Sequence, residues 1–134
     1  MVWLGRCRIE HSAFDGAAFG GQLGHFALGR LNGIAQLLVA FSRYSGLDLS
    51  LQATGDLPHH LIEDVGICVG ASVAALLSAT AARYGDRTIP MDDALVHCAL
   101  DLGGRPYYRG PLPSGLYDHW MRSFADNALA TVHL

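Results

Sequence analysis

The stretch PHHLIEDVGICVG, residues 58–70, joins two adjacent histidines and an acidic pair to an almost unbroken apolar run. Proline suits the first turn of a helix, and the run has no strong break before Arg83-Tyr84-Gly85. We therefore predict one long helix over residues 58–83. Beyond its first turn this helix is apolar nearly all round, which predicts that it lies at the centre of the fold.

Elements of alternating type flank this helix in the sequence. Apolar residues at three- and four-residue spacing predict helices, and alternation of leucines with polar residues predicts a half-buried strand. We expect an edge strand over 2–9, a helix over 31–44, a strand within 47–55, a buried strand over 94–102, a loop over 103–115, and a helix over 115–128 that passes into a terminal strand. This order predicts an α/β fold, an α+β two-layer sandwich in which a mixed sheet packs against helices.

Length and composition favour one domain that associates with other subunits. The chain has 134 residues, enough to bury a core without disulfide or metal staples, so we expect a single domain over 1–134. A hydrophobic fraction of 51% with only 16% charged residues predicts that other subunits cover some apolar surface, as in a homo-oligomer. Glycine and serine interrupt the longest apolar run, so no membrane partner is expected.

Charge and cysteine usage narrow the functional classes. A net charge of -3 with scattered basic residues excludes a nucleic-acid footprint. The sequence has no lysine, which excludes Schiff-base chemistry and leaves arginine or backbone amides to bind any phosphate. Cys7, Cys68 and Cys98 form an odd set without CxxC spacing, and the N-terminus lacks a signal peptide, so we expect reduced cysteines and a cytoplasmic protein.

The polar start of the predicted helix is the first candidate site. On a helix, residues four apart share a face, so His59 and Glu63 can converge on one point, and His60, Asp64 and again Glu63 on a neighbouring one. Imidazole and carboxylate at this spacing suit Mn²⁺, Fe²⁺ or Zn²⁺. The alternative, at about even odds, is that the acids complement the helix dipole in the first turn and the histidines are solvated.

Four other polar positions are candidates with ordinary alternatives. Arg83 and Arg105 follow a helix end and a Gly-Gly turn, where a guanidinium can bind a phosphate with two nitrogens; surface salt bridges are the alternative. Asp92 and Asp93 precede a buried strand and can orient a base or ligand, but a turn is the stronger interpretation.

Two histidines lie on predicted strands. His133 is in the terminal strand and His97 in the middle of the apolar run 94–102. A lone histidine in such a place is more often a satisfied core residue than a ligand. From the residues alone we therefore predict core positions for both.

Four ordered segments together carry a resemblance to a known family. ATGDLPHHLIEDVGICVG, RYGDRTIPMDDAL, DLGGRP and FADNALATVHL resemble imidazoleglycerol-phosphate dehydratase of histidine biosynthesis over residues 31–134, whereas 1–30 match poorly. The resemblance implies a lyase that removes water from imidazole glycerol phosphate to give imidazole acetol phosphate with paired Mn²⁺ ions. It also implies a large homo-oligomer with sites at subunit boundaries, and a fold like one and a half repeats of the dehydratase.

The resemblance assigns metal ligands and catalytic residues by position. His59, His60 and Glu63 match the family's metal-binding histidine–histidine–glutamate motif, and His133 matches the histidine of its "TLH" strand. Glu63 is also a candidate catalytic carboxylate, because a carboxylate or metal-bound hydroxide must take a weakly acidic proton. In this scheme a metal-bound imidazolate accepts the electrons.

The same resemblance assigns residues that contact the substrate. Arg83 and Arg105 match arginines that hold the substrate phosphate. Asp92 matches the aspartate of the family's "PMDEAL" segment, near the reacting diol, and is a catalytic candidate. Glu10 corresponds to a substrate-facing glutamate near the first strand.

Departures from the family pattern leave three hypotheses open. Gln36 stands where the family's "FLDHML" helix carries a metal-binding histidine, only Pro58 separates "GDL" from the two histidines, and the second HHxxE motif and a phosphate-binding lysine are absent. The chain is then a dehydratase, a non-catalytic metal- or phosphate-binding homologue, or one half of a site that two copies complete.

Overall fold

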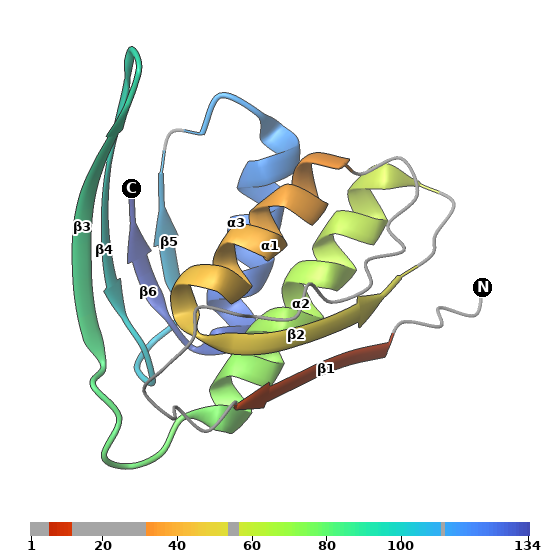
Figure 1. Cartoon of the computed structure of the whole chain (residues 1–134), viewed down its shortest axis with the longest axis vertical. Coiled ribbons are helices and arrows are strands. Elements are labelled where there is room, and N and C mark those ends of the chain that lie inside the picture. The colour runs from red at the N-terminus through yellow and green to blue at the C-terminus, as the bar shows by residue number, and fades with distance from the viewer. Residues whose placement is uncertain (1–5, 12–31, 54–56, 111) are drawn as a thin grey trace. The chain divides into compact units, whose positions relative to one another are not determined.

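The structure is a computed structural model that describes residues 6–11, for the backbone only, and 32–53, 57–110 and 112–134 (Figure 1). Its internal contacts divide the chain into two compact units, residues 1–61 and 62–134. The division falls within helix α2 (Pro58–Leu76). Each unit is described by itself.

The first unit contains a two-stranded antiparallel sheet and one helix. Strand β1 (Arg6–His11) pairs with β2 (Leu47–Gln52), and helix α1 (Asn32–Ser45) contacts β2. Gly46 ends the helix in the left-handed conformation, with a φ of 70°, which glycine adopts without strain. The leucines of β2 that alternate with polar residues point inward, as the sequence predicted; the buried apolar side chains of these two elements are Ile34, Leu38, Leu49 and Leu51.

The second unit is built on a four-stranded mixed sheet, which confirms the predicted fold class. The sheet contains β3 (Tyr84–Met91), β4 (Ala94–Asp101), β5 (Tyr107–Arg109) and β6 (Thr131–His133), in the order β3-β4-β6-β5. Helix α3 (Gly115–Ala128) connects β5 to β6, which lie parallel, and the other two pairs are antiparallel. The helix has the predicted bounds.

Two glycines bring α2 close to α3. A methyl group at Gly66 would lie 2.8 Å from the carbonyl oxygen of Trp120, and one at Gly70 would lie 2.5 Å from that of Phe124. Both distances are shorter than carbon and oxygen tolerate, so only glycine permits this approach. By length and composition alone, α2 is the one helix among the described residues that meets the criteria for crossing a membrane. Its contact with α3 is that of a core helix.

The two faces of the four-stranded sheet differ. Successive side chains of a strand point to opposite faces. Tyr108 is 8% exposed and Val132 1%, and they face α3, whose Trp120 and Phe124 are buried with their rings stacked 5.3 Å apart. The residues on either side in the sequence point the other way and are mostly exposed. The first of these faces is called the covered face below, and the second the open face.

Helix α2 is shorter than predicted, and two strands were not predicted. The helix ends at Leu76, not near Arg83, because a turn follows in which Ala81 donates its N–H to Ser78 and the hydroxyls of Ser78 and Thr80 lie 3.2 Å apart. Serine and threonine favour such turns over helix interiors. Strand β3 begins at Tyr84, and β5 lies within the segment predicted to be a loop.

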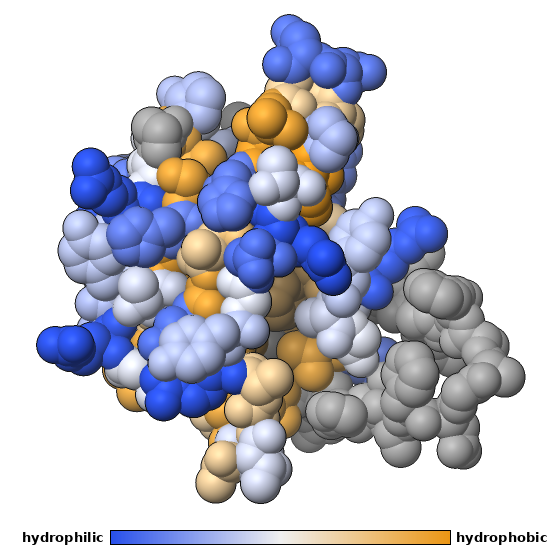
Figure 2. Space-filling view, turned by 90° about the vertical axis from the view of Figure 1, so that its left-hand side faces the viewer, coloured by the Kyte–Doolittle hydropathy of each residue, from blue (hydrophilic) through white to orange (hydrophobic). Residues whose placement is uncertain are grey.

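The strand predicted over residues 94–102 is confirmed as β4, but the prediction that it is buried is wrong, because its first four residues are exposed and the other four only partly buried. β4 pairs with β3 in a hairpin whose tip carries exposed apolar side chains, among them Ile89 (62% exposed) and Leu95 (70%). In Figure 2 hydrophobic surface lies just below the hydrophilic tip of this hairpin. His97 is exposed too, and its Nδ1 lies 2.7 Å from the hydroxyl of Thr88, so it is not a core residue.

Candidate functional site

The first turn of α2 carries the two histidines of the predicted metal motif. His59 and His60 are exposed, with ring centroids 4.1 Å apart and ring planes at 61°. The first turn of this helix holds no acidic residue. The first part of the alternative, acids that complement the helix dipole, therefore loses its basis, whereas the exposure of both histidines agrees with its second part, in which they are solvated.

Glu63 contacts a residue that the sequence did not suggest. Its Oε1 lies 3.0 Å from Nδ1 of His119 on α3, and both side chains are partly exposed. The close approach at Gly66 explains this pair, because Glu63 lies one turn before Gly66 on α2, and His119 lies one turn before Ser123, which faces that glycine. Only the helix crossing makes the two residues neighbours, so the sequence carries no local signal for it.

The donor types fit the predicted metal, but the number of converging donors does not. Imidazole nitrogen and carboxylate oxygen are suitable ligands for Mn²⁺. Within the described part of the chain, however, no group of three or more histidine, cysteine, aspartate or glutamate side chains is placed to hold a metal ion. Gln36, where the resemblance expected a further histidine, is exposed on α1.

Arg83 forms the surface ion pair that was the alternative to a phosphate role. Its Nη2 lies 3.1 Å from Oδ1 and 3.2 Å from Oδ2 of Asp101, and its Nε donates to the carbonyl oxygen of Leu102 at 3.0 Å. The guanidinium also lies 5.4 Å from the ring centroid of Tyr84. These contacts tie the start of β3 to the end of β4 and occupy several donors of the guanidinium.

The remaining candidates lie on different elements. Asp92 lies in the two-residue turn between β3 and β4 with a φ of 51°, a left-handed conformation that aspartate tolerates better than most residues. Arg105 is exposed, and its carbonyl oxygen accepts a hydrogen bond from the Thr131 hydroxyl at 2.9 Å. The backbone of Glu10 lies opposite Asp48 in the β1–β2 pair, but its side chain is outside the described part.

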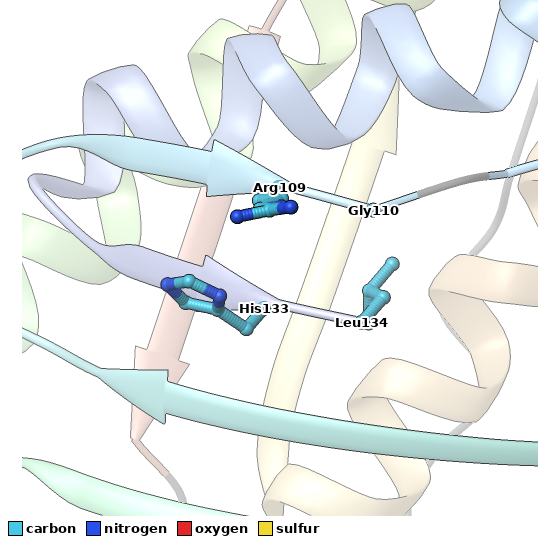
Figure 3. A pocket seen from close by; sticks show the side chains of 4 residues that line it. All are labelled: Arg109, Gly110, His133 and Leu134. Carbon is cyan, nitrogen blue, oxygen red and sulfur yellow. The ribbon is translucent and has the colours of Figure 1, made fainter.

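His133 lies on the open face of the sheet and not in the core. Arg109 is its register partner in the parallel β5–β6 pair, and the ring of Tyr107 lies 5.5 Å from the imidazole. Arg109 and His133 line a hollow together with Gly110 and Leu134, and Figure 3 shows the two basic side chains on neighbouring strands. Arg109 was not predicted as a site residue, because the strand that aligns it with His133 was not predicted.

A polar cluster fastens β5 to α3 on the covered face. The Tyr108 hydroxyl donates to Oδ1 of Asp118 at 2.8 Å, and Arg122 lies near both, with Nη2 at 3.5 Å from Oδ2 of Asp118. Burial of the phenol, and then its hydrogen bond to the Asp118 carboxylate, raise the pKa of Tyr108 to about 12. The tyrosine therefore stays neutral at ordinary pH and acts as a hydrogen-bond donor.

Comparison with known proteins identifies one family. Residues 31–134 match the model of the imidazoleglycerol-phosphate dehydratase family, the same range as the sequence motifs. A protein of that name from Methanoculleus marisnigri is 38% identical, covering 73% of this chain and 58% of its own length. Another from Chlorobium phaeobacteroides is 41% identical, with 73% of this chain and 56% of its own length covered. The chain thus spans less than two thirds of these relatives.

Solved structures of the same family have a similar fold. The crystal structure from Pyrococcus furiosus aligns with a TM-score of 0.75 and 29% identity, covering 96% of this chain and 72% of that one. The structure from Staphylococcus aureus gives a TM-score of 0.76 and 28% identity, with 96% and 76% covered. The fold expected from the motifs is confirmed by this likeness.

Proposed function

This chain belongs to the imidazoleglycerol-phosphate dehydratase family, and from that membership we infer that it acts in histidine biosynthesis as a hydro-lyase that converts imidazole glycerol phosphate to imidazole acetol phosphate. The observation that carries the proposal is the family match over residues 31–134, which includes the exposed His59 and His60. Proteins of this name are its relatives over about three quarters of its length.

We extend the proposal to a Mn²⁺ centre that more than one subunit completes. His59, His60, Glu63 and His133 provide nitrogen and oxygen donors of the right type, but one described chain does not gather a full set. Donors from a second copy would supply the rest, in a homo-oligomer whose sites lie at subunit interfaces. The exposed apolar residues of the β3–β4 hairpin, such as Ile89 and Leu95, are consistent with an oligomer.

The chain's own residues would hold the ligands and move the proton. A bound metal ion supplies positive charge that favours the deprotonated imidazole of the substrate. The exposed histidines of α2 would bind the metal ion, and the Glu63 carboxylate, whose Oε1 lies 3.0 Å from Nδ1 of His119, keeps its second oxygen for a ligand or a proton. Asp92 and Glu10 remain candidates for contacts with the reacting part of the substrate, and Arg83 and Arg105 for contacts with its phosphate. A cytoplasmic location remains part of the proposal.

A non-catalytic homologue is the second candidate. Exposed Gln36, in place of the expected histidine, and the lack of three converging donors among the described residues favour it. Such a protein would bind a metal or phosphate ligand without turnover, alone or with a complete paralogue.

Turnover of imidazole glycerol phosphate by the purified chain, with and without Mn²⁺, distinguishes the two. The proposal predicts ketone product only with Mn²⁺, loss of product in His59→Ala together with weaker Mn²⁺ binding by electron paramagnetic resonance, and unchanged turnover in the matched control His97→Ala. His97 is also an exposed histidine, but it contacts Thr88 on the hairpin. Folded wild-type protein that binds Mn²⁺ but forms no product would establish the second candidate instead.

A further inference from the structure

We propose that Asp101 is a positioning residue that holds the guanidinium of Arg83 in place for the phosphate of the substrate. The inference rests on the proposed function, because that proposal is what gives Arg83 a phosphate to bind. Arg83 immediately precedes β3 and Asp101 is the last residue of β4, and the antiparallel pairing of these strands brings the two residues together. A backbone hydrogen bond of 2.9 Å from Leu102 to the carbonyl oxygen of Arg83 closes this end of the hairpin.

The contacts of Arg83 involve two of its three guanidinium nitrogens. Nη2 lies 3.1 Å from Oδ1 and 3.2 Å from Oδ2 of Asp101. Nε lies 3.3 Å from the same Oδ1 and 3.0 Å from the carbonyl oxygen of Leu102. Within the described part of the chain Nη1 makes no hydrogen bond, so both of its N–H groups are free to donate to a ligand. The side chain of Arg83 is 47% exposed, which leaves this nitrogen open to an incoming phosphate.

A guanidinium that is already held binds an anion more tightly than a mobile one. An arginine side chain has many rotamers, and a ligand that orders them loses affinity to the lost entropy. The Asp101 carboxylate restricts Arg83 before a ligand arrives, and so does the Tyr84 ring, whose centroid lies 5.4 Å from the guanidinium carbon. Asp101 also reduces the positive charge at this place, so its effect on orientation and its effect on charge have opposite signs.

The turn after β4 brings Arg105 next to this ion pair. Gly103 has a φ of 79°, a left-handed conformation that favours glycine. A methyl group at Gly104 would lie 3.2 Å from Oδ2 of Asp101 and 3.5 Å from Nη2 of Arg83, so the pair packs directly against Gly104. Arg105 is the next residue and is exposed, and the proposed function assigns it to the same phosphate. Asp101 therefore holds Arg83 beside the backbone that carries the second arginine.

The sign of the effect on phosphate binding distinguishes positioning from charge. If Asp101 acted only through its charge, its removal would tighten phosphate binding. Positioning predicts about fivefold weaker binding of inorganic phosphate in Asp101→Ala, and an intermediate value in Asp101→Asn, which keeps one acceptor oxygen for Arg83. A titration at constant ionic strength, followed by NMR of the Arg83 guanidinium N–H signals, measures both variants. Binding by Asp101→Ala that equals or exceeds that of wild type, or no saturable shift at Arg83 in wild type, would overturn the proposal.

Two controls separate this effect from changes in net charge and in stability. Asp126→Ala removes the same charge from an exposed position on α3, and its phosphate binding should equal that of wild type. The ion pair of Asp101 is partly exposed, so its loss should leave the midpoint of urea unfolding nearly unchanged. If Asp101→Ala is nevertheless destabilised, Asp101→Asn, which has nearly the same shape, decides the outcome.

Turnover separates this inference from the proposed function. Phosphate binding that Asp101→Ala weakens, in a protein without turnover, would support the positioning role and contradict the dehydratase activity. Turnover whose KM for imidazole glycerol phosphate is the same in Asp101→Ala as in wild type would support the activity and contradict the positioning role. If both proposals hold, Asp101→Ala raises KM about fivefold and changes kcat less than about twofold, because the phosphate is bound equally in the ground state and the transition state.

Discussion

The covered and open faces of the four-stranded sheet are formed by the same strands, yet one is buried against α3 and the other is mostly exposed. On the covered face Tyr108 and Val132 are buried, and a hydrogen bond to Asp118 fastens β5 to α3. On the open face Tyr107, Arg109 and His133 are exposed, and Arg109 and His133 line a hollow. Because adjacent residues of one strand point to opposite faces, the contribution of one residue to stability can be measured separately from a binding role proposed for its neighbour.

The largest loss of stability is expected at the close contact between α2 and α3, the two helices on the covered side of the sheet. Gly70→Ala places a methyl group 2.5 Å from the Phe124 carbonyl oxygen and 2.9 Å from the Ala128 nitrogen, both backbone atoms that cannot move aside. We expect a loss of about 3 kcal/mol in the free energy of unfolding, measured by urea denaturation. Gly115→Ala, at a helical glycine with nothing within 4 Å, is the control and should change stability by less than about 0.5 kcal/mol. Equal effects would show that α2 and α3 do not cross at Gly70.

A pair of neighbouring residues on β6 tests the two faces directly. Val132 is 1% exposed, so Val132→Ala removes buried methyl groups and should cost about 2 kcal/mol of unfolding free energy. His133→Ala, one residue later and exposed, should cost less than about 0.5 kcal/mol. The same urea denaturation measures both variants. A destabilising His133→Ala beside a neutral Val132→Ala would mean that the faces are assigned the wrong way round.

The smallest loss of stability among the substitutions of buried residues is expected at the hydrogen bond between Tyr108 of β5 and Asp118 of α3. Tyr108→Phe removes the hydrogen bond to Asp118 and should cost about 1 kcal/mol near neutral pH. The pKa of Tyr108 is raised from 10.0 to about 12 in the folded protein, so its contribution is fully present below pH 10 and is lost as the pH rises toward 12. Unfolding free energies across this interval should therefore fall more steeply for wild type than for Tyr108→Phe.

Tyr107→Phe provides the matched control for that pH dependence. Tyr107 is the neighbouring tyrosine on β5 but is half-exposed on the open face. Its variant should follow the wild-type curve between pH 10 and 12. If Tyr107→Phe and Tyr108→Phe behave alike, the burial of Tyr108 and its hydrogen bond to Asp118 are not the cause of the pH dependence.

Local patterns were sufficient for the elements whose signals lie within their own residues. The bounds of α3 follow from the Pro-Ser-Gly start and the apolar spacing that buries Trp120 and Phe124, and the alternation in β2 predicts which leucines are buried. Strand β3 was missed because YGDRTIPM contains a glycine, a proline and two charges, which weaken any strand pattern. The backbone hydrogen bonds to β4 stabilise β3 as a strand although its own residues have a weak strand preference.

The candidate site required tertiary information that no local pattern holds. The apolar run of β4 indicates a strand but not whether anything in the chain covers it, so His97 and Leu95 were placed in the core when both are exposed. His119 reaches Glu63 only through the helix crossing, and Arg109 reaches His133 only through the β5–β6 register. The family's ordered motifs identified His59, His60 and the fold, because those depend on sequence directly.

The most direct test of the account is turnover of imidazole glycerol phosphate, with Mn²⁺, by oligomers assembled from two inactive variants, His60→Ala and His133→Ala. If each centre takes His60 from one subunit and His133 from another, mixed oligomers contain some centres with both histidines intact. The account predicts that each variant alone is inactive and that mixing after joint unfolding and refolding restores part of the wild-type rate. Mixed oligomers that stay inactive, when refolded wild type is active, would contradict a site shared between subunits.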